Sequence, residues 1–212
     1  MKKYLIRYLL EFKFVAQNMR APRNNLVGFF AAKLMAEAND KSVADAVNRL
    51  QIQTGEHVLE LGSGNGYGLQ CMESKSPGRL IGVEISERFR EMIQQRKLKN
   101  LEIYEQDAIN MSNFIPSNSI DKMLAMNVVY FLDPLSAYAI ELKRILKKGT
   151  GLGILGCKPK AIATGNTNIF KNKSIDDIKK TLLAAGLDVH EVLIDLGNPV
   201  ESYTALKIRN PI

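Results

Sequence analysis

Residues 57–68 read His57-Val58-Leu59-Glu60-Leu61-Gly62-Ser63-Gly64-Asn65-Gly66-Tyr67-Gly68, and this stretch decides the fold. The apolar run at residues 58–61 predicts a strand that is buried on both faces. The four glycines that follow at alternate positions allow a tight turn and let a ligand approach bare backbone. A helical pattern comes next, and its first amides face the same space. A strand, a glycine turn and a helix in this order predict a site for a nucleotide-like ligand.

The chain after this stretch alternates short apolar runs with amphipathic helical segments. We expect a Rossmann-like α/β fold with a seven-stranded, mostly parallel sheet, helices on both faces and an antiparallel last strand. Strands are expected at about 58–61, 79–84, 101–105, 120–126, 151–156, 188–196 and 201–208. In such sheets ligands bind at the carboxyl ends of the strands, where the strand order reverses.

The region before the first strand has helical spacing and no strand pattern. It predicts an N-terminal helical cap or lid over residues 1–50, ahead of a ligand-binding domain over residues 51–212. Asp40 is expected to end the second helix of the cap. Ser42 and Asp45 have the spacing of a capping box that would begin a third helix.

The composition is that of an ordinary globular protein, with 212 residues, 46% hydrophobic and 24% charged. A chain of this length can bury a core without disulfides or a structural metal. Cys71 and Cys157 have no metal-binding spacing, so no metal site is expected. Arg7, Glu11 and Lys13 interrupt the first apolar run, which argues against a signal peptide. These features favour a cytoplasmic protein.

Two acidic residues narrow the choice of nucleotide. Glu84 ends the second strand, where a carboxylate can accept both hydroxyls of a ribose. Asp107 follows the third strand, where a carboxylate can accept the exocyclic amine of adenine. The glycine spacing does not match the NAD fingerprint, because Tyr67 stands where the third glycine belongs. Glu60, just before the turn, is poorly placed for a pyrophosphate and well placed for an ammonium group.

Several motifs in order resemble those of the class I S-adenosylmethionine-dependent methyltransferases. The resemblance covers about residues 50–208 and rests on five segments. These are the first motif at 58–66, the second strand with its ribose-binding acid at 81–86, the adenine-contacting step at 106–108, the end of the fourth strand at 126–131, and the turn before the fifth strand at 141–149.

The resemblance implies a methyltransferase with S-adenosyl-L-methionine as its cofactor. In this family the enzyme mainly aligns the nucleophile, the methyl carbon and the sulfur for an in-line displacement, and alignment can supply roughly 7–11 kcal/mol of a barrier. By resemblance, Glu60 holds the methionine ammonium directly or through water, Glu84 takes the ribose, and Ile85 covers one face of the adenine. The other implied cofactor contacts are Gly62, Ser63, Gly64 and Gly66 at the turn, Asp107 and Ala108 at the adenine edge, and Asn127 near the methionine part.

The acceptor of the methyl group is expected to be a small molecule or a lipid-like molecule. Tyr130, just past the fourth strand, is the best-placed general base if the acceptor is a hydroxyl or an unactivated carbon, with ordinary packing as the alternative. A pI of about 9.3 suggests an RNA methyltransferase as an alternative, although no RNA-binding module is recognisable. A cofactor-binding protein without catalysis is a further alternative.

The net charge of +7 is concentrated in two segments. Residues 1–25 have a net charge of +5 and residues 157–173 have +4. The second segment follows the fifth strand, which predicts that it lies at the same sheet edge as the cofactor. We expect both segments to border the acceptor entrance and to favour an anionic or membrane-associated acceptor, with a solvated lysine-rich surface as the alternative. The helix expected at residues 4–19 can pack on the domain, act as a lid or contact a membrane surface.

Replacement of Lys158, Lys160, Lys171 and Lys173 by Gln is expected to raise the KM for the acceptor, because a favourable electrostatic attraction is lost. The measurement is steady-state kinetics at low salt, where exposed charges are screened least. Unchanged kinetics would show that these lysines form only a solvated surface.

Overall fold

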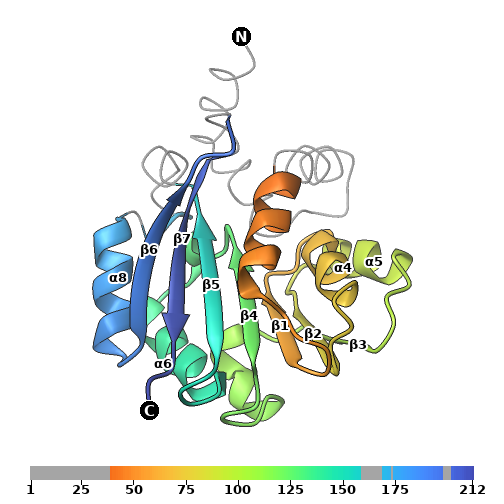
Figure 1. Ribbon diagram of the computed structural model, residues 1–212, viewed down its shortest axis with the longest axis horizontal. Helices are drawn as coiled ribbons and strands as arrows, with labels where there is room; N and C mark the ends of the chain where they lie inside the picture. Colours follow the sequence, from red (N-terminus) through yellow and green to blue (C-terminus); the bar gives the residue numbers. More distant parts are fainter. Residues whose placement is uncertain (1–38, 159–168, 173, 198–201) are drawn as a thin grey trace.

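One seven-stranded sheet forms the centre of the computed structural model, which describes residues 39–158, 169–172, 174–197 and 202–212 (Figure 1). Its strands lie in the order β3-β2-β1-β4-β5-β7-β6. They are β1 (His57–Leu61), β2 (Arg79–Val83), β3 (Leu101–Tyr104), β4 (Lys122–Met126), β5 (Leu152–Cys157), β6 (Asp188–Ile194) and β7 (Tyr203–Arg209). β7 pairs antiparallel with both of its neighbours, and the pairs among β1 to β5 are parallel. The predicted fold class is therefore confirmed.

Helices cover both faces of the sheet, and each face has its own apolar core. The helices are α4 (Tyr67–Glu73), α5 (Glu87–Gln95), α6 (Leu135–Ile145) and α8 (Ile175–Ala184), with the 3-10 helices η1 (Ala108–Asn113) and η2 (Val129–Phe131). Leu59 of β1 packs in the core under α6 and α8, whereas Val58 packs in the core that α4 shares with residues 39–50. Neighbouring strand residues point to opposite faces, so one buried strand serves both cores. Among the described helices, none has the length and apolar character needed to cross a bilayer.

Residues 39–50 form a single helix, which corrects two expectations at the N-terminal end. Asp40 does not end a helix, and Ser42 does not cap one. The hydroxyl of Ser42 instead donates to the carbonyl oxygen of Asn39 at 2.8 Å, as serine does inside a helix. The sequence pattern was misleading because the side chains of serine and aspartate can hydrogen-bond to nearby backbone groups both at the start of a helix and inside one. Residues 1–38, where the rest of the predicted cap lies, are outside the described residues.

The helix at residues 39–50 shares the core of the α/β domain. Its inner face buries Val47 and Leu50 in the same core as Leu124 of β4. A polar anchor adds to this packing, since the hydroxyl of Tyr203 donates to Asp45 at 2.6 Å. Figure 1 shows this helix, in orange, beside the strands at the centre of the sheet. The described part of the predicted cap is thus continuous with the domain.

The parallel register brings the carboxyl ends of neighbouring strands level. Glu60 of β1 pairs with Gly82 of β2 and lies opposite Leu124 of β4. Met126 at the end of β4 pairs with Gly156 of β5. The strand order reverses between β1 and β4, so the segments that follow these strands meet where a ligand is expected.

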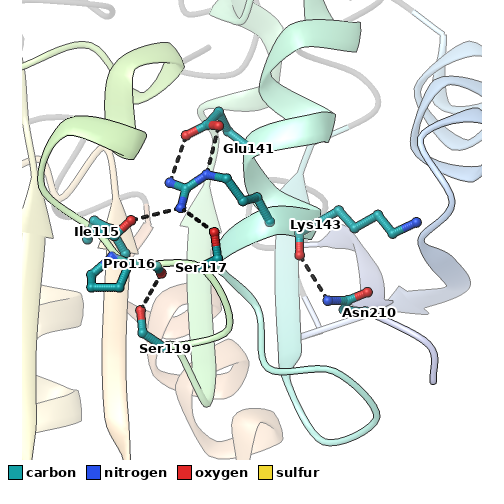
Figure 2. Close-up of polar contacts among 8 residues, drawn as sticks. Ile115, Pro116, Ser117, Ser119, Glu141, Lys143 and Asn210 are labelled. Carbon is teal, nitrogen blue, oxygen red and sulfur yellow. Dashed lines mark hydrogen bonds and ion pairs between the residues drawn. The ribbon is translucent and has the colours of Figure 1, made fainter.

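The opposite end of the sheet is held by polar ties to the carboxyl end of α6 (Figure 2). Arg144 donates to both carboxylate oxygens of Glu141 at 2.9 Å and to the carbonyl of Ile115 at 2.9 Å. The amide nitrogen of Asn210 donates to the carbonyls of Lys143 and Leu146 at 3.0 and 2.9 Å. It satisfies carbonyls that the end of a helix leaves without partners.

Replacement of Asn210 by Asp should destabilise the protein more than replacement by Ala. Both changes remove the two hydrogen bonds from the Asn210 side chain, but Asp also puts a carboxylate oxygen against the two carbonyls. Ala instead removes the Oδ1 atom, which is buried and has no hydrogen-bond partner among the described residues. We expect the free energy of unfolding to fall by about 3 kcal/mol for Asp and about 1 kcal/mol for Ala. Urea unfolding measures both, with Lys148→Ala on the exposed surface as the control. Equal losses would show that Asn210 acts by packing alone.

Candidate functional site

The glycine turn between β1 and α4 lies against the end of β4. A Cβ atom added at Gly62 would lie 2.3 Å from Cγ2 of Val128, so the two segments approach this closely only because residue 62 is glycine. A Cβ atom added at Gly64 would meet no described atom within 4 Å. The backbone at Gly64 therefore borders open space at the point where the strand order reverses.

Glu60 is a buried carboxylate with an unused acceptor. The carboxylate of Glu60 fits here because residue 68 is glycine. A Cβ atom at that position would lie only 1.9 Å from Glu60 Oε1. Glu60 is 3% exposed, and its Oε2 atom has no hydrogen-bond partner within the described structure. Burial raises the pKa of Glu60 well above its usual range, and the backbone amide of Leu69 only partly opposes that rise. A cationic group that reached Oε2 would satisfy both the charge and the free acceptor.

Glu84 is the second buried carboxylate at this edge. Its Oε2 atom accepts from the amide of Gly64 at 2.9 Å and its Oε1 atom from the amide of Ser86 at 2.8 Å. Burial raises the pKa of Glu84 to about 7, although both amides favour the ionised form. Each carboxylate oxygen can accept a second hydrogen bond. The group can therefore hold the turn and still accept from two hydroxyls of a ribose.

The predicted adenine-contacting residues lie at the ends of β2 and β3. A hydrogen bond joins these two strand ends, because the amide of Glu84 donates to the carbonyl of Tyr104 at 2.9 Å. Ile85 is 41% exposed, although it is a large apolar residue. Asp107 caps η1, and its Oδ1 atom accepts from the hydroxyl of Tyr138 at 2.7 Å. Its Oδ2 atom makes no hydrogen bond to the described residues. Ala108, the next predicted contact, is buried.

Ser63 is also buried, and its hydroxyl donates to the carbonyl oxygen of Glu60 at 3.0 Å. This bond closes the glycine turn on itself. The amide of Gly66 donates to the carbonyl of Ser63 at 2.8 Å and continues the turn into α4. Ser63 thus shapes the turn through its side chain, so any contact of Ser63 with a cofactor is expected from its backbone.

Both polar atoms of the Asn127 side chain make hydrogen bonds within the protein. Its Oδ1 atom accepts from the hydroxyl of Tyr130 at 2.8 Å, and its Nδ2 atom donates to Asn39 at 3.2 Å. Its backbone lies in the left-handed region, with φ of 56°. Among the described residues, no donor binds its carbonyl oxygen. If Asn127 contacts the cofactor as predicted, its backbone carbonyl is the group that is free to do so.

Tyr130 is buried, and its hydroxyl accepts from the amide of Lys158 at 2.5 Å while it donates to Asn127. Burial raises the pKa of Tyr130 well above its usual range. A tyrosine can accept a proton as a general base only when its own hydroxyl is ionised and within reach of the substrate. This environment favours a positioning role for Tyr130 over the role of general base expected from the sequence.

Two arginines that the sequence did not single out hold the site loops. Arg96, just after α5, donates to the carbonyl of Asn65 in the glycine turn at 2.6 Å and also to Gln70 of α4. Arg90 of α5 donates to the carbonyls of Glu84 and Ile85 at 3.1 and 2.9 Å. In the sequence, Arg90 and Arg96 are only two of several basic residues in and just after one helix. Their carbonyl partners depend on how α5 packs against the sheet.

Residues 59–154 match a family model described as a methyltransferase domain. In an alignment of 139 positions that covers 60% of the chain, the sequence is 32% identical to the 23S rRNA (uracil(1939)-C(5))-methyltransferase RlmD of Shewanella denitrificans. The match covers 28% of that protein, so the chain spans about a quarter of the curated relative's length.

Solved structures with the same fold include methyltransferases. A chain from the complex of the Haloferax volcanii Trm112 methyltransferase activator with a methyltransferase has a TM-score of 0.73 at 18% identity, covering 85% of this chain and 94% of that chain. A SAM-dependent methyltransferase from Aquifex aeolicus has a TM-score of 0.63 at 16% identity, with coverage of 78% and 88%. A phosphoethanolamine N-methyltransferase of Haemonchus contortus in complex with S-adenosyl-L-methionine has a TM-score of 0.65 at 12% identity, with coverage of 81% and 53%. At these identities the likeness shows the fold alone.

The polar groups at this edge fit the parts of S-adenosylmethionine. The unpartnered Oε2 atom of Glu60 suits the methionine ammonium. The remaining acceptor capacity of Glu84 suits the ribose, and the exposed side chain of Ile85 suits one face of the adenine. These assignments stay predictions, and each depends on a single side chain that can be changed.

The change Glu60→Gln should stabilise the free protein and weaken cofactor binding. Because the pKa of Glu60 is raised on folding, the wild type loses stability as the pH rises above the ordinary glutamate value of 4.5, whereas Gln carries no such dependence. We expect the variant to be about 1–2 kcal/mol more stable at pH 8 and no more stable at pH 4. Thermal unfolding at both pH values and calorimetric titration with S-adenosylmethionine measure the two effects. Undiminished affinity would exclude Glu60 from the ammonium site.

Proposed function

We propose that this chain transfers a methyl group from S-adenosylmethionine to a small-molecule or lipid-like acceptor, which the match of residues 59–154 to a methyltransferase domain and the fold shared with methyltransferases support. The observation that carries the proposal is the alignment of Glu60, Glu84 and Asp107 along one sheet edge, beside the open backbone at Gly64. These groups complement an ammonium, a ribose and an adenine amine in the order in which the cofactor presents them. The bound cofactor supplies a methyl group on a positively charged sulfur.

The contribution of the chain is to hold the cofactor in one orientation. Glu60 and Glu84 are buried and fixed by neighbouring backbone amides, so little side-chain freedom is lost on binding. The arginines of the α5 region fix the loops from which these groups act. Orientation of this kind can supply roughly 7–11 kcal/mol of a reaction barrier without a dedicated acid or base.

The placement of the basic segment, residues 157–173, supports an anionic acceptor. At its start, the backbone of Lys158 donates to the hydroxyl of Tyr130. Near its end, the backbone of Lys171 donates to the carbonyl of Tyr130 at 2.7 Å, and the ring of Phe170 packs against those of Tyr130 and Phe131, with centroids 5.6 and 5.1 Å away. Both ends are thus anchored beside β4 at the carboxyl edge. Cationic side chains there would attract an anionic acceptor toward the cofactor.

An RNA acceptor is the second candidate. It is favoured by the 32% identity to an rRNA methyltransferase and by the basic sequence, with a pI of about 9.3. Because the chain spans about a quarter of that relative, the similarity supports a shared cofactor domain more strongly than a shared acceptor. The small-molecule or lipid-like acceptor therefore remains the leading proposal.

The experiment that separates these candidates uses S-adenosylmethionine with a labelled methyl group. The purified protein is incubated with cell extract divided into metabolite, lipid and RNA fractions, with Glu84→Ala as the background control. We expect label in the metabolite or lipid fraction. Label in RNA alone would support the second candidate. Cofactor binding without label in any fraction would indicate a binding protein without catalysis.

Cofactor choice is tested by thermal unfolding. Saturation with S-adenosylmethionine at about 100 Kd should stabilise the protein by roughly 2.7 kcal/mol, and NAD should have no such effect. Glu84→Ala should abolish most of this gain because the ribose acceptor is lost. Glu87→Ala is the matched control, since Glu87 is an exposed acid three residues further along the chain. Stabilisation by NAD but not by S-adenosylmethionine would overturn the proposed function.

A further inference from the structure

Four residues at the carboxyl edge form a closed ring of hydrogen bonds, which we call the Asn39 ring. The amide of Lys158 donates to the hydroxyl of Tyr130 at 2.5 Å, and that hydroxyl donates to Asn127 Oδ1 at 2.8 Å. Asn127 Nδ2 donates to Asn39 Oδ1 at 3.2 Å, and the ammonium of Lys158 donates to the same oxygen at 2.6 Å. The ring joins the ends of β4 and β5 to the helix at residues 39–50.

The direction of every hydrogen bond in the ring follows from Lys158. An ammonium and a backbone amide can only donate, so Asn39 must present its oxygen and Tyr130 must use a lone pair. Tyr130 then donates its proton to Asn127 Oδ1, which leaves Asn127 Nδ2 to face Asn39. No member can reverse without breaking a bond elsewhere in the ring.

The ring fixes an unusual backbone conformation at Asn127. Asn127 has a φ of 56°, in the left-handed region that asparagine adopts more readily than most residues, and the two side-chain hydrogen bonds of the ring hold it there. The amide of Asn127 donates to the carbonyl of Gly156 at 2.7 Å, and the next residue, Val128, lies over Gly62. The conformation of Asn127 therefore sets the wall of the glycine turn on the side of β4.

We propose that Asn39 is a positioning residue for the amino-acid end of the cofactor. It acts through Asn127, whose backbone borders the turn that follows Glu60, and it does not touch the cofactor itself. This inference rests on the proposed function, because it assumes that the cofactor has an amino-acid end to position. The inference also implies that the helix at residues 39–50 and the cofactor site are thermodynamically coupled. Docking of the helix would strengthen cofactor binding, and bound cofactor would stabilise the docked helix.

A purely structural role predicts a different outcome. The helix at residues 39–50 is held along its length by Val47 and Leu50 in the core and by the bond from Tyr203 to Asp45. Removal of the Asn39 side chain, at the end of the described helix, should leave these anchors intact. A structural anchor would affect stability and all ligands alike, whereas a positioning residue should affect only ligands that carry the amino-acid part.

The test is calorimetric titration with S-adenosylhomocysteine and with adenosine, which lacks the amino-acid part. Asn39→Ala should weaken S-adenosylhomocysteine binding about tenfold, because it removes the acceptor of hydrogen bonds from the neutral amide of Asn127 and the charged ammonium of Lys158. Adenosine binding should change by no more than about twofold. Asn39→Asp should restore binding, because a carboxylate can accept from both Asn127 and Lys158. Asp45→Asn is the matched control, which loosens the helix anchor without touching the ring.

Equal weakening of both ligands by Asn39→Ala, or no recovery with Asn39→Asp, would overturn the inference. A selective loss in Asp45→Asn would also overturn it, because the effect would then come from the helix as a whole. A wild-type protein that binds neither ligand would overturn the proposed function and this inference with it. Selective binding losses in a protein that labels no acceptor would support the inference and contradict the proposed transfer reaction.

Discussion

The burial of two carboxylates beside bare backbone is the constraint on which the rest of the site depends. Glu60 and Glu84 each lose most of their hydration, and their mutual repulsion adds to the raised pKa of Glu60. The surrounding protein compensates with backbone amides more than with cations. The free protein is therefore electrostatically unfavourable at this edge, and a ligand with an ammonium group and donor hydroxyls would relieve that cost.

Close packing at the glycine turn follows from the same constraint. Gly68 leaves room for the carboxylate of Glu60, and Gly62 lets Val128 close over the turn. Two arginines then hold the backbone from outside, because Arg96 binds the turn itself and Arg90 binds the loop after β2. Substitutions at Gly68, Arg90 or Arg96 would change the site without removing any of the groups predicted to contact the cofactor.

Elements distant in the sequence control the β4 side of the site. Asn39 and Asn127 are 88 residues apart, yet their side chains meet, and Lys158 closes the ring from the end of β5. The buried Phe170 returns to the same place and packs against Tyr130. The β4 side of the site is thus held by residues from the helix at residues 39–50 and from the ends of β4 and β5, whereas the other side is built from the ends of β1, β2 and β3.

The sequence alone determined the sheet, the glycine turn and the candidate acids, because these depend on local patterns and on the rule that parallel strands present their carboxyl ends together. Glu60, Glu84 and Asp107 could be named since each lies at or within three residues of the carboxyl end of a strand. Only the tertiary structure decided that residues 39–50 form one helix, that the side chain of Asn127 is already occupied, and that Tyr130 is buried. These outcomes depend on which hydrogen-bond partners packing brings together, and a pattern of neighbouring residues carries no information about partners that lie tens of residues away.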